Sequence, residues 1–242
     1  MFAEDEAALL VEAAASTAEL ETMVRQRVSG TPLEQVLGWA EFCGLRTLVE
    51  PGVFVPRRRS ALLVEHVVAL LDGVRAPVAV DLCCGTGAVA AAVHQARGDV
   101  ELHAADIYPC AVHCARRNLD GIGTVHEGDL TAALPDELAG RVDVIVANAP
   151  YVPSDEIVMM PPEARDHEPR VALDGGTDGV DIHRRVAEQA PPWLRPGGHL
   201  VTETSRRQAP LTVEAMTRHG FDTRVVRSDD LDATAVLGRK MG

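Results

Sequence analysis

The sequence lacks any apolar run approaching the roughly 20 residues that a membrane-spanning helix needs. Its first apolar stretch, residues 7–15, follows Glu4, Asp5 and Glu6, whereas a secretory signal begins with basic residues. The five cysteines are an odd number and do not have the spacing of a disulfide framework. We therefore expect a cytoplasmic protein with reduced thiols and no membrane segment.

Positive charge is also scarce, because 23 Lys and Arg stand against 36 Asp and Glu, for a formal net charge of −13. Association with a nucleic acid backbone is favoured by a positive potential, so this balance makes nucleic acid an unlikely direct substrate. Arg57-Arg58-Arg59 is a local exception. It predicts either a contact with an acidic patch or a phosphate, or simply an exposed basic turn.

The order of expected elements indicates the fold. At 242 residues and 46% hydrophobic content, the chain is long enough for one sizeable α/β domain with a small appendage. We expect helices at 4–28, 62–71, 86–96, 110–119, 181–193 and 211–218, a strand pair with turns within 39–55, and strands at 78–81, 100–106, 124–127, 142–147, 199–204, 223–227 and 233–237. After Pro77 this alternation predicts a parallel sheet with covering helices. The loop 153–177 is long, and such loops are usually functional or mobile.

The first strand of this alternation leads into Leu82-Cys83-Cys84-Gly85-Thr86-Gly87. Glycines at a strand-to-helix junction let the backbone approach a ligand, and the helix N-terminus offers donors to an anionic group. We expect Gly85 and Gly87, flanked by Asp81 and Cys83, to bind a cofactor. The loop also fits the dinucleotide pattern, so alone it does not separate nicotinamide from S-adenosylmethionine.

Two acids follow the next strands. Asp106 lies about 20 residues beyond the glycines, where an acid accepts hydrogen bonds from ribose hydroxyls. Asp129, followed by Leu130, is placed to meet an adenine amino group, and Ile107 to cover the adenine face. A strand-end aspartate is also a common turn former or helix cap. The shared position of these acids at successive strand ends favours the ligand interpretation, because open α/β sheets bind ligands there.

The cysteine pairs Cys83-Cys84 and Cys110/Cys114 invite a redox or metal interpretation. A zinc site needs about four converging ligands, and His113 beside the second pair points elsewhere. We expect these cysteines to be small buried packing residues and expect no metal.

Asn148-Ala149-Pro150-Tyr151 follows an apolar strand and so lies at the same sheet edge. An amide nitrogen is a weak nucleophile, and methyl transfer to it requires the lone pair to be turned toward the methyl group. The Asn148 side-chain oxygen and the Ala149 carbonyl could each accept one N–H bond, while Tyr151 stacks on the planar group. The same four residues would also make an ordinary tight turn.

In these motifs the chain resembles the HemK/PrmC-type protein-glutamine methyltransferases, which methylate a glutamine amide in class I peptide-chain release factors. The shared segments are residues 32–38, 41–45, 51–57, the glycine loop, 148–151, the Gly-Gly-x-Asp-Gly segment within 172–181, and 194–198. The resemblance implies a Rossmann-like, seven-stranded, mostly parallel sheet with an antiparallel last hairpin. It also implies S-adenosylmethionine as cofactor, S-adenosylhomocysteine as product, a short N-terminal recognition region at 1–56 and a catalytic domain at 57–242.

By the same resemblance, Phe54, Pro56 and Arg57 are expected to bind a protein substrate with an exposed glutamine, such as a release factor. The chain departs from the family in having Ala149 for proline, which keeps the carbonyl but loses the fixed φ. It also has Arg58-Arg59-Ser60 for Pro-Glu-Thr, and its helical region before Gly30 is shorter than the family's. Three alternatives remain: transfer to adenine N6 or a small-molecule amine, a non-catalytic cofactor-binding module, and a nicotinamide oxidoreductase.

Overall fold

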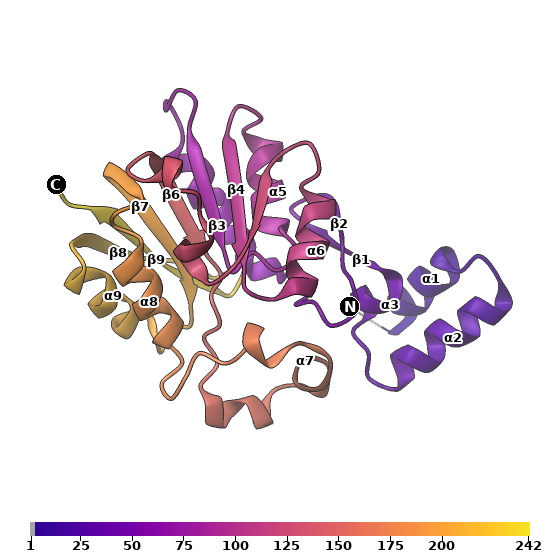
Figure 1. Cartoon of the computed structure of the whole chain (residues 1–242). Coiled ribbons are helices and arrows are strands. Elements are labelled where there is room, and N and C mark those ends of the chain that lie inside the picture. The colour runs from indigo at the N-terminus through magenta and orange to yellow at the C-terminus, as the bar shows by residue number, and fades with distance from the viewer. Residues whose placement is uncertain (1–2) are drawn as a thin grey trace.

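The computed structural model describes residues 3–242, and its centre is a seven-stranded sheet in the order β5-β4-β3-β6-β7-β9-β8 (Figure 1). The pairs β7–β9 and β8–β9 are antiparallel and the others are parallel, as expected. The strands of this sheet are β3 (Val78–Leu82), β4 (Glu101–Asp106), β5 (Thr124–Glu127), β6 (Val142–Ala147), β7 (Leu194–Thr204), β8 (Phe221–Ser228) and β9 (Ala233–Lys240).

Helices cover both faces of the sheet, which explains why every residue of β3 and β6 is buried. One face packs against α4 (Ala61–Leu70), α5 (Ala88–Ala96) and α6 (Pro109–Asn118). The other packs against α8 (Asp181–Gln189) and α9 (Ala209–Arg218). Adjacent parallel strands therefore end together at one sheet edge, below the sheet in Figure 1.

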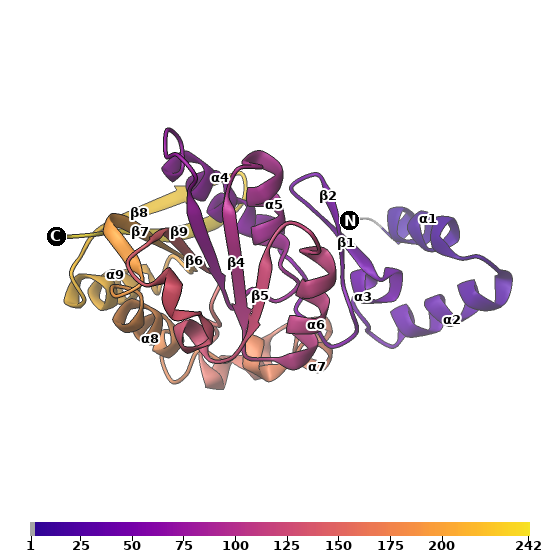
Figure 2. The same cartoon turned by 45° about the horizontal axis from the view of Figure 1, so that its top comes forward.

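The N-terminal helices stand apart from the sheet on the side of α6 in both Figures 1 and 2. They are α1 (Ala3–Ala13), α2 (Thr17–Val28) and α3 (Leu33–Leu37), which share a small apolar cluster. A hairpin of β1 (Trp39–Phe42) and β2 (Leu45–Leu48) follows them, and Asn118 of α6 bonds to both backbone groups of Leu48. We retain residue 56 as our proposed boundary between this region and the rest.

The structure differs from the sequence expectations in three places. Pro196-Gly197-Gly198 lies inside β7 rather than before it, because Leu194 already pairs with Val142 and the register then shifts. The helix expected at 181–193 ends at Gln189. The long loop is ordered by α7 (Pro162–His167) and by the short helices η4 (Ser154–Met159) and η5 (Arg170–Ala172).

The cysteines divide by environment. Cys84 and Cys114 are buried as expected, and Cys83 is only partly buried. Cys110 is exposed at the start of α6, so the prediction of burial is wrong for it. Over residues 3–242, no helix is long and apolar enough to cross a membrane.

Candidate active site

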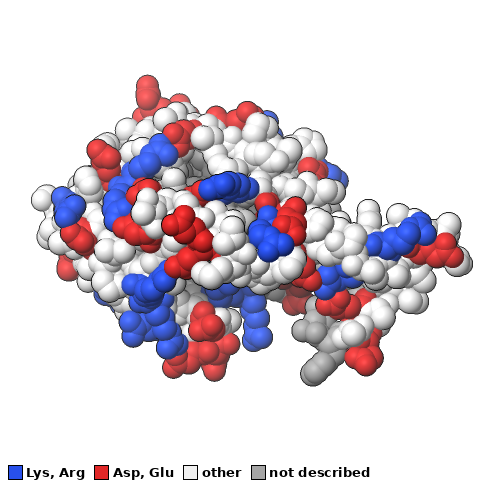
Figure 3. Space-filling view, turned by 90° about the horizontal axis from the view of Figure 1, so that it is seen from below, with Lys and Arg blue, Asp and Glu red and all other residues white. Residues whose placement is uncertain are grey.

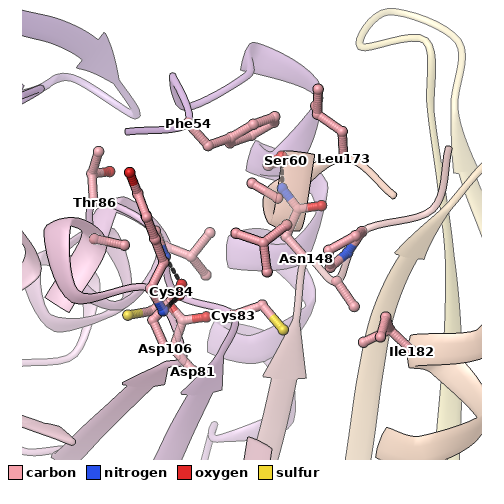
Figure 4. Close-up of a pocket in the computed structure, with 18 of the residues that line it drawn as sticks. Phe54, Ser60, Asp81, Cys83, Cys84, Thr86, Asp106, Asn148, Leu173 and Ile182 are labelled. Carbon is pink, nitrogen blue, oxygen red and sulfur yellow. Dashed lines mark hydrogen bonds between the residues drawn. The ribbon is translucent and has the colours of Figure 1, made fainter. Parts of the chain in front are cut away.

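A cleft opens where β3, β4 and β6 end, with about 1380 Å³ of space when the solvent at its open mouth is included. Its walls come from the glycine loop, the two strand ends that carry acids, the segment before α4, the Asn148–Tyr151 motif, and the loop that carries α7. Figure 3 looks onto the face that carries α7 and shows acidic and basic side chains interspersed there, with no single broad positive patch. Figure 4 shows Asp106 and Asn148 on opposite sides of the cleft, with Cys83 between them.

The glycine loop is shaped by Asp106. Its Oδ2 accepts a hydrogen bond from the Gly85 backbone N–H at 2.9 Å, and its Oδ1 accepts one from Tyr108 N–H at 2.9 Å. Burial raises the pKa of this carboxyl above its usual value, and the two backbone donors oppose that rise. Each carboxylate oxygen can accept a further bond, so Asp106 can hold the loop and still receive hydroxyl donors from the cleft.

Gly85 and Gly87 differ in position, although the sequence places them together. Gly85 lines the cleft, has a positive φ, and has open space where a side chain would begin. Gly87 is buried behind the loop, and a Cβ there would lie 3.1 Å from Leu119. The structure therefore gives Gly87 a packing role beside α6, while Gly85 faces a ligand directly.

The floor of the cleft is formed in part by Asp81 and Cys83. Asp81 is buried and accepts a hydrogen bond from Ala90 N–H at 3.2 Å, and burial raises the pKa of its carboxyl to about 7. Cys83 takes a positive φ, which is unusual for a side chain with a Cβ. Burial raises the pKa of its thiol well above the usual value, so Cys83 is a neutral group.

On the next side of the cleft, Asp129 forms an ion pair with Arg185, with 2.6 Å between Oδ2 and Nη2. Ile107, 51% exposed, and Leu130 also line this part. Arg185 and Ile182 come from α8, and the sequence prediction did not include them. Their spacing of three residues puts both on one face of α8, but no local pattern in the sequence marks that face as the one toward the cleft.

The acceptor motif is held by a residue that the sequence analysis did not assign to the site. Asn148 donates a hydrogen bond from Nδ2 to Ser60 Oγ at 3.2 Å, as Figure 4 shows. Ser60 is buried, at 2% exposure, where η1 (Arg58–Ser60) meets α4. Because the amide nitrogen is bound to Ser60, Asn148 Oδ1 remains as the acceptor for a ligand.

Tyr151 is held by Glu203, at the end of β7. The Tyr151 hydroxyl donates to Glu203 Oε1 at 3.0 Å, and the same oxygen accepts from Arg59 Nε at 3.0 Å. Burial and the Glu203 charge raise the pKa of the Tyr151 phenol, which therefore stays neutral.

The Gly-Gly-x-Asp-Gly segment packs directly behind the motif. A Cβ on Gly175 would lie 2.8 Å from the Pro150 carbonyl oxygen, and one on Gly179 would lie 2.5 Å from the Tyr151 carbonyl oxygen. Gln208 adds a hydrogen bond of 2.7 Å from Nε2 to that same Tyr151 oxygen. Glycines are therefore required here so that the segment can brace the acceptor motif.

The predicted substrate-binding residues Phe54, Pro56 and Arg57 all line the cleft. The Arg57 guanidinium lies 4.9 Å from the centre of the Phe54 ring and donates from Nη2 to buried Glu168 at 2.6 Å. Arg57 and Arg59 thus each meet an acidic residue of the same chain, whereas Arg58 is exposed. Arg57 and Arg59 therefore match the expected contact with acidic groups, and Arg58 matches the expected exposed basic turn.

The cleft fits a cofactor that carries an adenosine. Strand-end carboxylates can accept from hydroxyl and amino groups, Ile107 and Leu130 provide apolar surface for a base, and the Gly85 backbone is open to a ligand. In residues 3–242, no group of three or more His, Cys, Asp or Glu side chains is arranged to hold a metal.

Comparison with known proteins agrees with this geometry. The family model described as methyltransferase small domain matches residues 44–162. A release factor glutamine methyltransferase of Geobacter sulfurreducens is 35% identical, over 91% of this chain and 77% of that relative. A 4-amino-L-phenylalanine/4-methylamino-L-phenylalanine methyltransferase of Streptomyces pristinaespiralis is 35% identical, over 74% of this chain and 63% of that relative.

Among solved structures, a methyltransferase of Pyrococcus furiosus covers 92% of this chain and 100% of its own, with 15% identity and a TM-score of 0.59, so it supports the fold. The sequence relationship to the Geobacter protein is the stronger finding, because it combines substantial identity with coverage of most of both chains. The chain therefore belongs to the release factor glutamine methyltransferases, the HemK/PrmC-type family of S-adenosylmethionine-dependent enzymes.

Proposed function

We propose that this chain methylates the side-chain amide nitrogen of a glutamine in a peptide-chain release factor. The observation that carries the proposal is the orientation of Asn148, whose Nδ2 is bound to Ser60 so that Oδ1 faces an acceptor. An amide N–H₂ group has two donors, and this site offers two oxygens, Asn148 Oδ1 and the Ala149 carbonyl. Such a site complements a terminal amide and leaves its nitrogen lone pair directed elsewhere.

Methyl transfer to this nitrogen does not require a general base with a shifted pKa. Bonds to both N–H groups turn the amide so that its lone pair points across the cleft, and Tyr151 stacks on its planar face. The two oxygens stabilise the positive charge that develops on nitrogen, and the proton is lost readily once that charge has formed. Ala149 supplies the same carbonyl as the proline it replaces, and the brace of Gly175 and Gly179 limits the freedom that alanine adds.

The cofactor-binding roles that we propose use the opposite side of the cleft. Asp106 would receive ribose hydroxyls, Asp129 the adenine amino group, and Ile107 and Leu130 the faces of the base. Gly85, Asp81, Cys83 and Asn148 would line the remainder of the cofactor site. S-adenosylmethionine, when bound, supplies an electrophilic methyl group and leaves as S-adenosylhomocysteine.

Phe54, Pro56 and Arg57 would contact the protein substrate at the mouth of the cleft. Arg57 is fixed by Glu168, which also accepts from Val55 N–H at 3.1 Å, so the segment presents a defined surface. A release factor as substrate would place the reaction in the cytoplasm.

A second candidate acceptor is a small-molecule arylamine, because one relative is named for such a substrate. An arylamine nitrogen is also planar, conjugated and neutral, so the two oxygens that suit an amide suit it as well.

The test is to incubate the enzyme and methyl-labelled S-adenosylmethionine with one candidate acceptor at a time. The three acceptors are purified release factor, 4-amino-L-phenylalanine and a DNA duplex. Mass spectrometry of the protein arm should place the label on one glutamine. Asn148→Ala should abolish transfer with little change in cofactor affinity, whereas Asp106→Ala should weaken cofactor binding in calorimetry. Label in the arylamine arm alone, or full turnover by Asn148→Ala, would contradict the proposal.

A further inference from the structure

A buried carboxylate lies beside the acceptor motif without an assigned role. The register of β6 and β7 pairs Ala147 with Thr202, so the next residues, Asn148 and Glu203, are neighbours at the sheet edge. The Glu203 residue is only 2% exposed. Its Oε1 accepts both from Tyr151 and from Arg59, while its Oε2 is buried and has no hydrogen-bond partner among residues 3–242.

This arrangement lowers the stability of the fold. Burying a carboxylate carries a large desolvation penalty, which an ion pair offsets only when the remaining lone pairs of the carboxylate are also satisfied. Here both donors converge on one oxygen and the other is left bare. An apolar pair of similar volume would avoid that penalty, so the structure points to a use of Glu203 at the site.

We propose that Glu203 is a positioning residue that fixes the ring of Tyr151 against the acceptor nitrogen, with Arg59 holding the same carboxylate oxygen. The inference rests on the proposed function, in which Tyr151 stacks on the acceptor. The hydroxyl oxygen of a tyrosine moves when the side chain turns about Cα–Cβ, so a hydrogen bond from that hydroxyl to a carboxylate at a strand end fixes where the ring lies. A phenol that donates to a carboxylate also has a more electron-rich ring, which favours positive charge developing at its face.

Arg59 contacts both Glu203 and the Tyr151 ring. Its guanidinium carbon lies 5.9 Å from the centre of the Tyr151 ring, and its Nε holds Glu203. Burial disfavours the charged guanidinium, but Tyr151 and Glu203 together outweigh that effect and the pKa of Arg59 is raised. The Tyr151 hydroxyl therefore shares its carboxylate acceptor with a guanidinium.

A double-mutant cycle with Tyr151→Phe and Glu203→Gln or Glu203→Leu tests the proposal. Loss of one hydrogen bond to a charged group predicts a fall in kcat of roughly 10- to 100-fold for Glu203→Leu, a smaller fall for Glu203→Gln, and little change in cofactor Kd. If Glu203 acts through Tyr151, then Glu203→Leu should add little to Tyr151→Phe. If the double variant loses kcat by the product of the two single losses, or if Glu203→Leu keeps the wild-type kcat, the proposal is wrong.

Glu214→Gln is the matched control, because Glu214 forms an exposed pair with Arg218 on α9, away from the cleft. Its kcat should equal that of the wild type. A cofactor Kd that rises in step with the loss of kcat in both Glu203 variants would indicate general disruption and would count against a positioning role.

A readout that needs no acceptor separates this inference from the proposed function. The chain has two tyrosines, so ring-labelled tyrosine gives two sets of NMR signals, assigned with Tyr108→Phe. In wild type the Tyr151 ring protons should show nuclear Overhauser contacts to one fixed set of neighbours, and in Glu203→Leu these contacts should weaken as the ring takes other orientations about Cα–Cβ. Unchanged Tyr151 signals would refute the inference, whereas failure of the wild type to methylate a release factor would refute only the proposed function.

Discussion

The Ser60–Asn148 hydrogen bond gives a prediction that isolates a single contact. Ser60→Ala removes the hydroxyl that holds Asn148 Nδ2 at 3.2 Å. The side chain of Ser60 makes no capping bond to α4, so the substitution removes the contact to Asn148 without weakening the start of that helix. The Asn148 amide would then be free to turn over and present its N–H₂ group to the acceptor, which also brings N–H groups.

The magnitude follows from the worth of one hydrogen bond between neutral groups, about 0.5–1.5 kcal/mol net. Since about 1.4 kcal/mol corresponds to a tenfold change in rate, Ser60→Ala should lower kcat by roughly 2- to 10-fold. The effect should fall on kcat rather than on cofactor affinity, because Asp106 and the glycine loop lie across the cleft. Ser60→Thr keeps the hydroxyl and should retain most of the activity.

Initial-rate kinetics on a release-factor substrate, with calorimetry for cofactor Kd and a thermal melt for each variant, would make the comparison. An unchanged kcat in Ser60→Ala would refute the proposed orientation of Asn148. An equal loss in Ser60→Thr would show that packing, and not the hydroxyl, matters at this position.

Two further predictions concern groups behind the site. Burial lowers the pKa of His183 from 6.5 to about 4, so the folded state binds fewer protons than the unfolded state between these values, and stability should rise with pH across that window. Relative to His183→Gln, the free energy of unfolding of the wild type should fall by up to roughly 3 kcal/mol as pH falls from 7 to 4. Urea unfolding that gives the same difference between the two proteins at every pH would contradict this. Gly175→Ala should reduce kcat strongly while sparing cofactor Kd, because its Cβ would lie 2.5 Å from the Gly179 carbonyl oxygen and 2.8 Å from the Pro150 oxygen. Gly98→Ala is the control, because Gly98 also lacks a positive φ but has open space around it, and equal kcat losses in the two variants would argue against the brace.

The parts of the site that lie on one continuous segment were predictable from sequence. The run of Val78–Leu82 into the glycine loop gave a buried strand and a ligand loop, and Asp106 and Asp129 followed from the rule that parallel strands end at one edge. The exception was Gly87, because a spacing pattern does not indicate which glycine faces the ligand and which faces Leu119.

The parts that depend on pairing between distant segments were not predictable. Ser60 lies 88 residues from Asn148, and Glu203 lies 52 residues from Tyr151. Serine and glutamate carry no local pattern that names their partners, and only the strand register brings Glu203 beside Asn148. A shift in that register after the Val142–Leu194 pair explains why Pro196-Gly197-Gly198, which locally favours a turn, lies within β7.

Charge pairing in the cleft bears on which acceptor is favoured. Both an amide and an arylamine satisfy Asn148 and Ala149, so the choice between them depends on the rest of the substrate. A free amino acid brings a carboxylate and an ammonium group, which need partners of opposite charge when they leave water. Each arginine that lines the cleft already has a carboxylate partner, Glu168 for Arg57, Glu203 for Arg59 and Asp129 for Arg185. The methionine end of S-adenosylmethionine already brings one such pair of charges into the cleft, and a free amino acid would add a second pair. A glutamine within a peptide adds none, and this favours a protein as the substrate.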